Sequence, residues 1–275
     1  MTHTRSQLRA LLERHDLVPS RALGQNFVVD PNTVRRIARL SAVGPETPVV
    51  EIGAGLGSLT LALAETGAPV TAVEIDRRLR PVLEEVVAGL DVRVVAGDAM
   101  DLPWPDLLAE HDRWILVANL PYNVATPLVL DLLVDVPAIE RMLVMVQREV
   151  GERLVAGPGT PAYGIPSVKV ALWARARIVA KVGPDVFWPR PRVDSALVEV
   201  VRRSHPATDA DPDLLVTLVE TGFNQRRKML RRSLAGLVPT QAFLDAGIDP
   251  EDRPERLSVQ DWGRLAKAVG AKSPA

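Results

Sequence analysis

The chain has 275 residues, of which 47% are hydrophobic and 24% charged, and its formal net charge is −1. This length allows one large domain, or one large and one small domain. The absence of cysteine excludes disulfides, thiolate zinc sites and cysteine nucleophiles. The four histidines are scattered, so we expect no metal site. A net charge near zero does not exclude a polyanionic partner, because basic residues can gather on one face.

The amino-terminal sequence predicts neither export nor membrane insertion. MTHTRSQLRALL alternates charged residues with leucine and lacks the uninterrupted apolar core of a secretory signal. No apolar run of the sequence approaches the roughly 18 residues that span a bilayer. We therefore expect a cytoplasmic, monomeric protein without membrane contact.

Four short runs rich in β-branched residues follow one another in the first half of the chain. They read PVVEIG, PVTAVEID, DVRVVAGD and RWILVANLP, and helical patterns separate them. One such pattern, SLTLALAETG, closes near Gly67, and another, RRLRPVLEEVVAGL, ends near Gly89, because glycine is a common helix stop. This alternation predicts a parallel sheet. MLVMVQ and SALVEVVR predict further strands, and we expect a hairpin-like pair to complete the sheet.

A polar, proline-bearing segment from Arg202 to Leu215, which includes RSHPATDADPDLL, marks the end of the β-rich runs and is expected to link two domains. The sequences beyond it, which include LLVTLVETGF and SVQDWGRLAKAV, have helical spacing. We therefore predict an α/β domain over residues 1–203 and a small all-α domain over residues 204–275.

A glycine-rich turn follows the first predicted strand. Gly53, Gly55 and Gly57 would let a ligand approach the backbone at the carboxyl end of that strand. The next two strands end near Glu74, which can accept hydrogen bonds from both hydroxyls of a ribose, and Asp98, which can reach the polar edge of an adenine. A structural turn with ordinary loop acids is the alternative. Three successive strand ends of this kind favour an adenosine site.

The missing phosphate motifs narrow the choice of adenosine ligand. The turn lacks the G-x-G-x-x-G spacing of dinucleotide enzymes, and no G-K-[ST] sequence supplies a P-loop lysine. S-adenosylmethionine carries adenosine without a phosphate. We therefore expect it as the cofactor.

The fourth predicted strand ends in the sequence VANLPYNVA. The strand stops at Asn119, and Pro121 ends the ladder because it lacks an amide N–H and has a fixed φ. The stiff turn that results would display the ring of Tyr122.

Taken in order, RALGQNFVVD, EIGAGLG, EID, GDA, NLPY and VFWPRPRVDSALVEV resemble the motifs of the ribosomal RNA adenine dimethyltransferases, the KsgA/RsmA family. The resemblance implies a Rossmann-like, S-adenosylmethionine-dependent methyltransferase domain with a cofactor-covering amino-terminal segment, followed by an RNA-contacting helical domain. In it Gly53 approaches the methionine end of the cofactor, Glu74 holds the ribose and Asp98 holds the adenine. The cofactor contacts that it implies are Asn26, the backbone at Val28, Gly53, Gly55, Glu74, Asp98, Ala99 and Asn119.

The target base is expected at the turn after the fourth strand. The side-chain oxygen of Asn119 and the carbonyl of Leu120 would accept hydrogen bonds from both protons of an adenine N6 amine, which frees its lone pair for attack on the sulfonium methyl. Tyr122 would stack on one face of the base, and the resemblance implies that Phe187 covers the other. The alternative is that Tyr122 is a rim residue and Phe187 a core aromatic.

Basic residues crowd the predicted helix FNQRRKMLRRSL without an acid between them. The i to i+4 spacing would place Arg227 over Arg231 and Lys228 over Arg232, which favours phosphate binding. A solvated basic face is the alternative. The arginines of PRPR are further candidates, so the expected RNA contacts are Arg190, Arg192, Arg226, Arg227, Lys228, Arg231 and Arg232.

The sequence therefore predicts an enzyme that dimethylates the N6 amines of two adjacent adenosines near the 3′ end of 16S rRNA during small-subunit biogenesis. Its expected partner is ribosomal RNA within a precursor particle. NLPY rather than NIPY, and VDSALV, favour this substrate over 23S rRNA, on which related macrolide-resistance enzymes act. An RNA-binding assembly factor that keeps the fold as a scaffold is the alternative from a different class.

Overall fold

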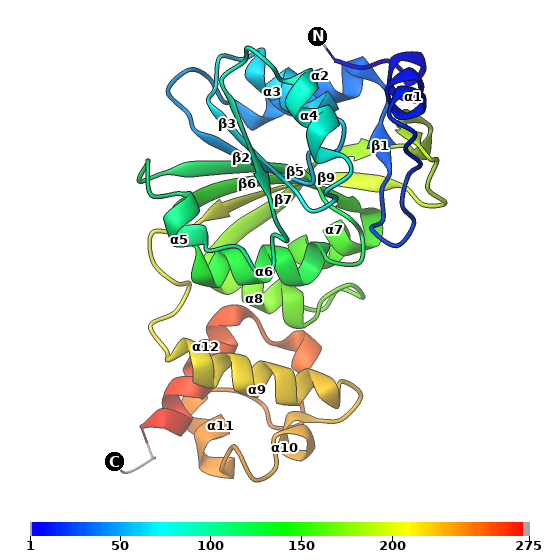
Figure 1. Cartoon of the computed structure of the whole chain (residues 1–275). Helices are drawn as coiled ribbons and strands as arrows, with labels where there is room; N and C mark the ends of the chain where they lie inside the picture. Colours follow the sequence, from blue (N-terminus) through cyan, green and yellow to red (C-terminus); the bar gives the residue numbers. More distant parts are fainter. Residues whose placement is uncertain (1, 272–275) are drawn as a thin grey trace. The chain divides into compact units, whose positions relative to one another are not determined.

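The computed structural model describes residues 2–271 and is shown in Figure 1. The chain divides into two compact units. The first comprises Met1–Gly151 and Arg177–Val201, and the second comprises Glu152–Ala176 and Arg202–Ala275. This division differs from the sequence-based domains 1–203 and 204–275 by assigning Glu152–Ala176 to the second unit. The reason is apolar packing, because Tyr163, Val168 and Leu172 lie in the same buried cluster as Trp262.

A mixed seven-stranded sheet organises the first unit, with the order β4-β3-β2-β5-β6-β9-β7. Neighbours from β4 to β6 pair in parallel, and β9 is antiparallel to β6. The predicted Rossmann-like α/β fold is therefore confirmed, with β9 and β7 as the closing neighbours. The strands are β2 (Val49–Ile52), β3 (Val70–Glu74), β4 (Val92–Ala96), β5 (Trp114–Asn119), β6 (Ile139–Gln147), β7 (Ala174–Val182) and β9 (Ser195–Arg202).

Helices cover both faces of the sheet, and this explains why its central strands are buried along their whole length. All four residues of β2 and all five of β3 are buried. Figure 1 shows α2, α3 and α4 on one face and α5 and α6 on the other. These helices are α2 (Pro31–Ser41), α3 (Ser58–Ala64), α4 (Arg80–Val86), α5 (Trp104–Leu107) and α6 (Ala125–Asp135).

The amino-terminal segment packs against the glycine-rich turn. Helix α1 (Arg5–Arg14) begins with a capping box at Thr4, and its buried Leu8 and Leu12 share an apolar cluster with Leu56 of the turn. After α1 the chain forms β1 (Phe27–Val28), which pairs antiparallel with β8 (Phe187–Trp188) and places Val28 opposite Phe187. Two segments far apart in sequence are thereby held together beside the sheet.

The second unit is helical. It contains α8 (Ile165–Trp173), α9 (Pro212–Asn224), α10 (Leu230–Ser233), α11 (Thr240–Ala246) and α12 (Val259–Gly270) around the fully buried Trp262. Helix α9 begins at the N-cap Asp211, and α12 begins with a capping box of Ser258 and Asp261. The 3-10 helix η2 (Pro254–Arg256) also belongs to this unit, whereas η1 (Pro184–Val186) belongs to the first unit. Helix α7 (Arg148–Val155) begins in the first unit and ends in the second. Within residues 2–271, no helix has the length and apolar character needed to cross a membrane.

We predict that Gly263→Ala destabilises the helical unit by about 1–3 kcal/mol, although alanine is the better helix former. A Cβ at this position of α12 would lie 2.3 Å from Thr208 Oγ1 and 2.7 Å from Thr208 Cβ, so the backbone would have to shift. Gly270→Ala is the matched control, because its Cβ would make an ordinary 3.7 Å contact with Leu214. Urea unfolding of both variants measures the difference, and equal stabilities would contradict the packing described here.

Candidate active site

A pocket lies at the carboxyl ends of the parallel strands. The strand order of the sheet reverses there, between β2 and β5, which is where doubly wound sheets bind their ligands. It consists of two cavities of about 220 and 60 Å³. We call them the larger and the smaller cavity of the strand-end pocket. Their shared lining residues are Leu23, Gly53, Ile75 and Pro121.

The glycine-rich turn and Glu74 form one bonded unit at the floor of this pocket. Gly53 and Gly55 have φ values of +75° and +60°, which favour glycine, and Gly53 lines both cavities. Glu74 at the end of β3 accepts a hydrogen bond from the Gly55 N–H at 2.7 Å and one from the Asp76 N–H at 2.8 Å. Its side chain is thereby fixed at the edge of the smaller cavity, which it lines.

Two acids of different character face the pocket. Glu74 is buried, and this burial raises the pKa of its carboxyl, with the two backbone hydrogen bonds opposing the shift. Asp98 is exposed, lines the larger cavity beside Ala99 and accepts a hydrogen bond from the Met100 N–H at 3.0 Å. One acceptor therefore lines each cavity, and the contacts of Glu74 with ribose and of Asp98 with adenine stay predictions.

The lining of the two cavities carries no Lys, Arg or His side chain among the residues that form it. Its charged members are Glu74 and Asp98, and the rest are apolar, glycine, amide or tyrosine residues. A phosphate would meet no cation here. The pocket therefore suits a ligand that has hydroxyl or amino groups, or a positive charge, and no phosphate.

The turn after β5 forms the opposite wall of the smaller cavity. Asn119 donates its amide Nδ2 to the carbonyl of Asn26 at 3.0 Å, so Oδ1 remains as an acceptor. Leu120 is held by its N–H, which donates to the Met145 carbonyl at 3.0 Å. Asn119, Leu120 and Tyr122 all line the smaller cavity, so the structure brings together three of the four residues expected to act on the base.

Tyr122 is anchored by its hydroxyl, which lies 2.8 Å from the hydroxyl of the buried Ser195. The phenol is half-buried, and this burial raises its pKa. Tyr122 comes from the NLPY motif, and Ser195 belongs to the late VDS sequence. This contact explains how two motifs far apart in the chain hold one aromatic ring at the pocket.

Phe187 and Val28 differ from the expectation. Phe187 is 0% exposed, lies in the main apolar cluster and lines neither cavity. The prediction that its ring covers the base is not met, and Phe187 is the core aromatic of the alternative interpretation. Val28 is also buried, and it pairs with Phe187 instead of lining the pocket, whereas Asn26 does line it.

The basic segment 226–232 of the helical unit is not one helix. Helix α9 ends at Asn224, a turn follows, and α10 begins at Leu230. Leu230 is fully buried and donates its N–H to the Asp252 carbonyl at 2.8 Å, which stops the first helix from continuing. The expected i to i+4 stacking of Arg227 over Arg231, and of the neighbouring pair, was therefore wrong.

Acids from a later segment approach two of these cations. Arg226 pairs with Glu255 at 2.6 Å, and Arg231 pairs with Glu251 at 3.1 Å. These acids line a hollow of about 610 Å³ on the helical unit. Among residues 2–271, no ion pair is recorded for the exposed cations Arg227, Lys228 and Arg232.

The two arginines of PRPR lie on the first unit. Arg190 and Asp185, both exposed, form an ion pair of 3.1 Å, and Arg192 is exposed. A metal site is not formed in the described part of the chain, because residues 2–271 contain no group of three or more histidine or acidic side chains arranged to hold an ion.

The sequence did not predict three features of the site. Ala22 and Leu23 line the larger cavity, and Gln25 reaches Asp76 from the same segment. The juxtaposition of Gln25 and Asn26 within RALGQNFVVD was the available signal. Glu51 was also missed. It is a buried residue of β2, and this burial raises its pKa to about 8.

Comparison with known proteins is consistent with this geometry. A model of the family described as "Ribosomal RNA adenine dimethylase" matches residues 20–270. "Ribosomal RNA small subunit methyltransferase A" of Kineococcus radiotolerans is 48% identical over 272 residues, which cover 94% of this chain and 89% of the relative. The protein of the same name from Streptomyces coelicolor is 46% identical over 277 residues, with 95% of each chain covered.

Two solved structures share the fold over most of the chain. The 23S rRNA methyltransferase ErmE has a TM-score of 0.68 and 27% identity, with 89% of this chain and 100% of that chain covered. A dimethyladenosine transferase from Plasmodium falciparum has a TM-score of 0.76 and 23% identity, with 88% and 97% covered. With the family match spanning nearly the whole sequence, this chain belongs to the ribosomal RNA adenine dimethylase family, as its motifs indicate.

Proposed function

We propose that this protein transfers methyl groups from S-adenosylmethionine to the N6 amines of two adjacent adenosines near the 3′ end of 16S rRNA, during maturation of the small subunit in the cytoplasm. The observation that carries the proposal is the strand-end pocket. Glu74 and Asp98 are the charged residues that line this pocket, and no basic residue of the described chain lines it. The two acids lie beside the turn that contains Asn119, Leu120 and Tyr122. We further propose that the protein acts as a monomer on a precursor particle.

The names of the similar proteins support 16S rRNA over the alternatives. Relatives that are 42–48% identical over nearly their whole length are called small subunit methyltransferases, whereas the 23S rRNA enzyme ErmE is 27% identical. The assembly-factor alternative requires no methyl transfer. An acceptor amide and an anchored aromatic ring beside a ligand-sized pocket favour catalysis over that scaffold role.

S-adenosylmethionine, when bound, supplies an electrophilic methyl group on a sulfonium. The residues that would hold it are those of the strand-end pocket. Gly53 leaves room for close approach because it has no side chain, Glu74 accepts from the ribose hydroxyls, and Asp98 accepts from the adenine amine at the exposed end. The lone pairs of Glu74 that the Gly55 and Asp76 N–H groups do not occupy remain for these hydroxyls.

Asn119 and Leu120 prepare the target amine. Because Nδ2 of Asn119 donates to Asn26, its Oδ1 is the atom that accepts from the N6 amine, and the Leu120 carbonyl accepts the second proton. These hydrogen bonds draw the nitrogen lone pair out of conjugation with the ring. Tyr122 offers a face on which the extruded base stacks, and such stacking contributes roughly 1–3 kcal/mol. No side-chain base is required, since the proton leaves to water after transfer.

We also propose that the basic residues Arg190, Arg192, Arg226, Arg227, Lys228, Arg231 and Arg232 contact RNA. Arg227, Lys228 and Arg232 are the strongest candidates, because they are exposed and take part in none of the ion pairs found among residues 2–271. Arg226 and Arg231 would first have to exchange their carboxylates for phosphates.

We predict that Asp98→Ala raises the dissociation constant for S-adenosylmethionine about tenfold, through loss of a hydrogen bond to a charged acceptor. We prefer this variant to Glu74→Ala, because loss of Glu74 would also leave the N–H groups of Gly55 and Asp76 without a hydrogen-bond acceptor. Calorimetric titration gives the affinity. Asp101→Ala is the control, because Asp101 is exposed and lines neither cavity. Equal affinities of the two variants would exclude the adenine contact.

We predict that Tyr122→Ala lowers the methylation rate roughly 5- to 150-fold, the equivalent of the stacking energy. Tyr122→Phe should retain more activity, because it keeps the ring and loses only the contact with Ser195. The measurement is mass mapping of dimethyladenosine in both large rRNAs from cells that lack the protein and express each variant. Unchanged 16S rRNA on removal of the protein would overturn the proposed function, and modification in 23S rRNA would favour the second substrate.

We predict that replacing Arg227, Lys228 and Arg232 by glutamine weakens RNA binding and flattens its salt dependence. Counterion release gives a slope change of roughly 0.7 to 0.9 for each lost phosphate contact. Filter binding across a salt series measures this slope, and a thermal melt checks folding. Arg264→Gln, on α12, is the control for loss of one arginine charge, since Arg264 pairs with Asp261. An identical slope would mean that these cations form a solvated face.

A further inference from the structure

The segment of residues 20–26, which we call the pocket loop, forms one wall of the strand-end pocket. Ala22 and Leu23 line the larger cavity, and residues 23–26 line the smaller one. Whatever fixes this loop therefore fixes part of the surface that both cavities present to a ligand.

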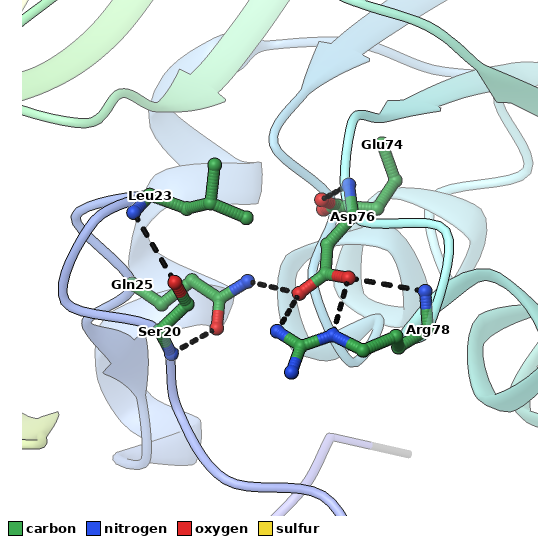
Figure 2. A network of polar contacts seen from close by, with 6 residues as sticks. All are labelled: Ser20, Leu23, Gln25, Glu74, Asp76 and Arg78. Carbon is green, nitrogen blue, oxygen red and sulfur yellow. Dashed lines mark hydrogen bonds and ion pairs between the residues drawn. The ribbon is translucent and has the colours of Figure 1, made fainter.

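Gln25 closes the pocket loop on itself and ties it to Asp76 in the segment after β3, as Figure 2 shows. Its Oε1 accepts from the Ser20 N–H at 2.7 Å, and its Nε2 donates to Oδ2 of Asp76 at 3.0 Å. The Leu23 N–H donates to the Ser20 hydroxyl at 3.3 Å. The Gln25 carboxamide thus has its oxygen and one N–H engaged by the protein itself.

Asp76 is a rigid partner for Gln25. Its side chain is 5% exposed, and it accepts from the Arg78 N–H and Nε at 3.0 Å each and from Arg78 Nη2 at 2.7 Å. Hydrogen bonding to Arg78 lowers the pKa of Asp76 to about 2, so this carboxylate stays charged. The Asp76 N–H also donates to Glu74, which connects the pocket loop to the glycine turn through consecutive hydrogen bonds.

A second tether holds the other end of the pocket loop. Asn26 accepts from the amide of Asn119 at the end of β5, at 3.0 Å. The loop therefore spans from β3 to β5 across the carboxyl ends of the sheet, with one side-chain hydrogen bond at each end.

We propose that Gln25 and Asp76 form a latch that holds the pocket loop against the bound cofactor and sets the rate at which the cofactor leaves. Asp76 is a positioning residue that acts through the pocket loop, whereas Gln25 lines the smaller cavity itself and also holds the neighbouring Leu23 and Asn26 in place. The inference rests on the proposed function in taking S-adenosylmethionine as the ligand. Opening the latch frees one end of the wall that the pocket loop forms, and it leaves Glu74, Asp98 and the tether between Asn26 and Asn119 in place.

The test is the dissociation rate of radiolabelled S-adenosylmethionine, chased with unlabelled compound. Gln25→Met keeps the length of the side chain and removes its hydrogen bonds, so the rate and the dissociation constant should both rise about tenfold. Gln25→Glu should have a larger effect, because it brings two carboxylates together.

The control is Gln241→Met, because Gln241 donates to Asp245 at 2.9 Å in the helical unit and loses the same kind of bond. Its dissociation rate should equal that of the wild type. Normal cofactor binding by the wild type, with an unchanged dissociation rate in a Gln25→Met variant whose thermal melt matches that of the wild type, would overturn the latch alone. Failure of the wild type to bind S-adenosylmethionine would overturn the proposed function and the latch together.

Discussion

The site depends on one buried carboxylate. Glu74 ends β3, and its two oxygens accept from the N–H groups of Gly55 and Asp76, so one side chain connects the glycine turn to the segment after the strand. A buried acid without such partners would disrupt the turn, because desolvation disfavours its charge. Here the hydrogen bonds offset part of the effect of burial, which still raises the pKa of Glu74, and they fix the floor of the pocket before any ligand arrives.

The opposite wall follows the same principle at the end of β5. The amide of Asn119 donates a hydrogen bond to the Asn26 carbonyl, and the hydroxyl of Tyr122 is hydrogen-bonded to that of Ser195. Both side chains are therefore held in fixed orientations at the smaller cavity. Preorganisation of this kind matters for methyl transfer, in which positioning supplies most of the catalysis. The protein needs little movement at these two residues to receive a base.

Local patterns predicted the strand ends, the glycine turn and the adjoining acids, because alternation and turn residues act over a few positions. Contacts between distant residues were beyond such patterns. Gln25 meets Asp76 from 51 positions away, and Phe187 is buried because β8 pairs with β1. The basic segment failed as a single helix because Leu230 is buried and its N–H is bonded to Asp252, neither of which appears in its own charge spacing.

The charged residues that line the strand-end pocket are both acidic, and this affects competition from the adenine nucleotides of a cell. ATP and ADP share the adenosine half of S-adenosylmethionine and would compete for the same cavities. Their phosphates would have to lie near Glu74 with no cation in the lining, and such like-charge contacts cost several kcal/mol. Under the proposed function, occupancy of the pocket would follow the supply of methyl donor and would not depend on the ratio of ATP to ADP in the cell.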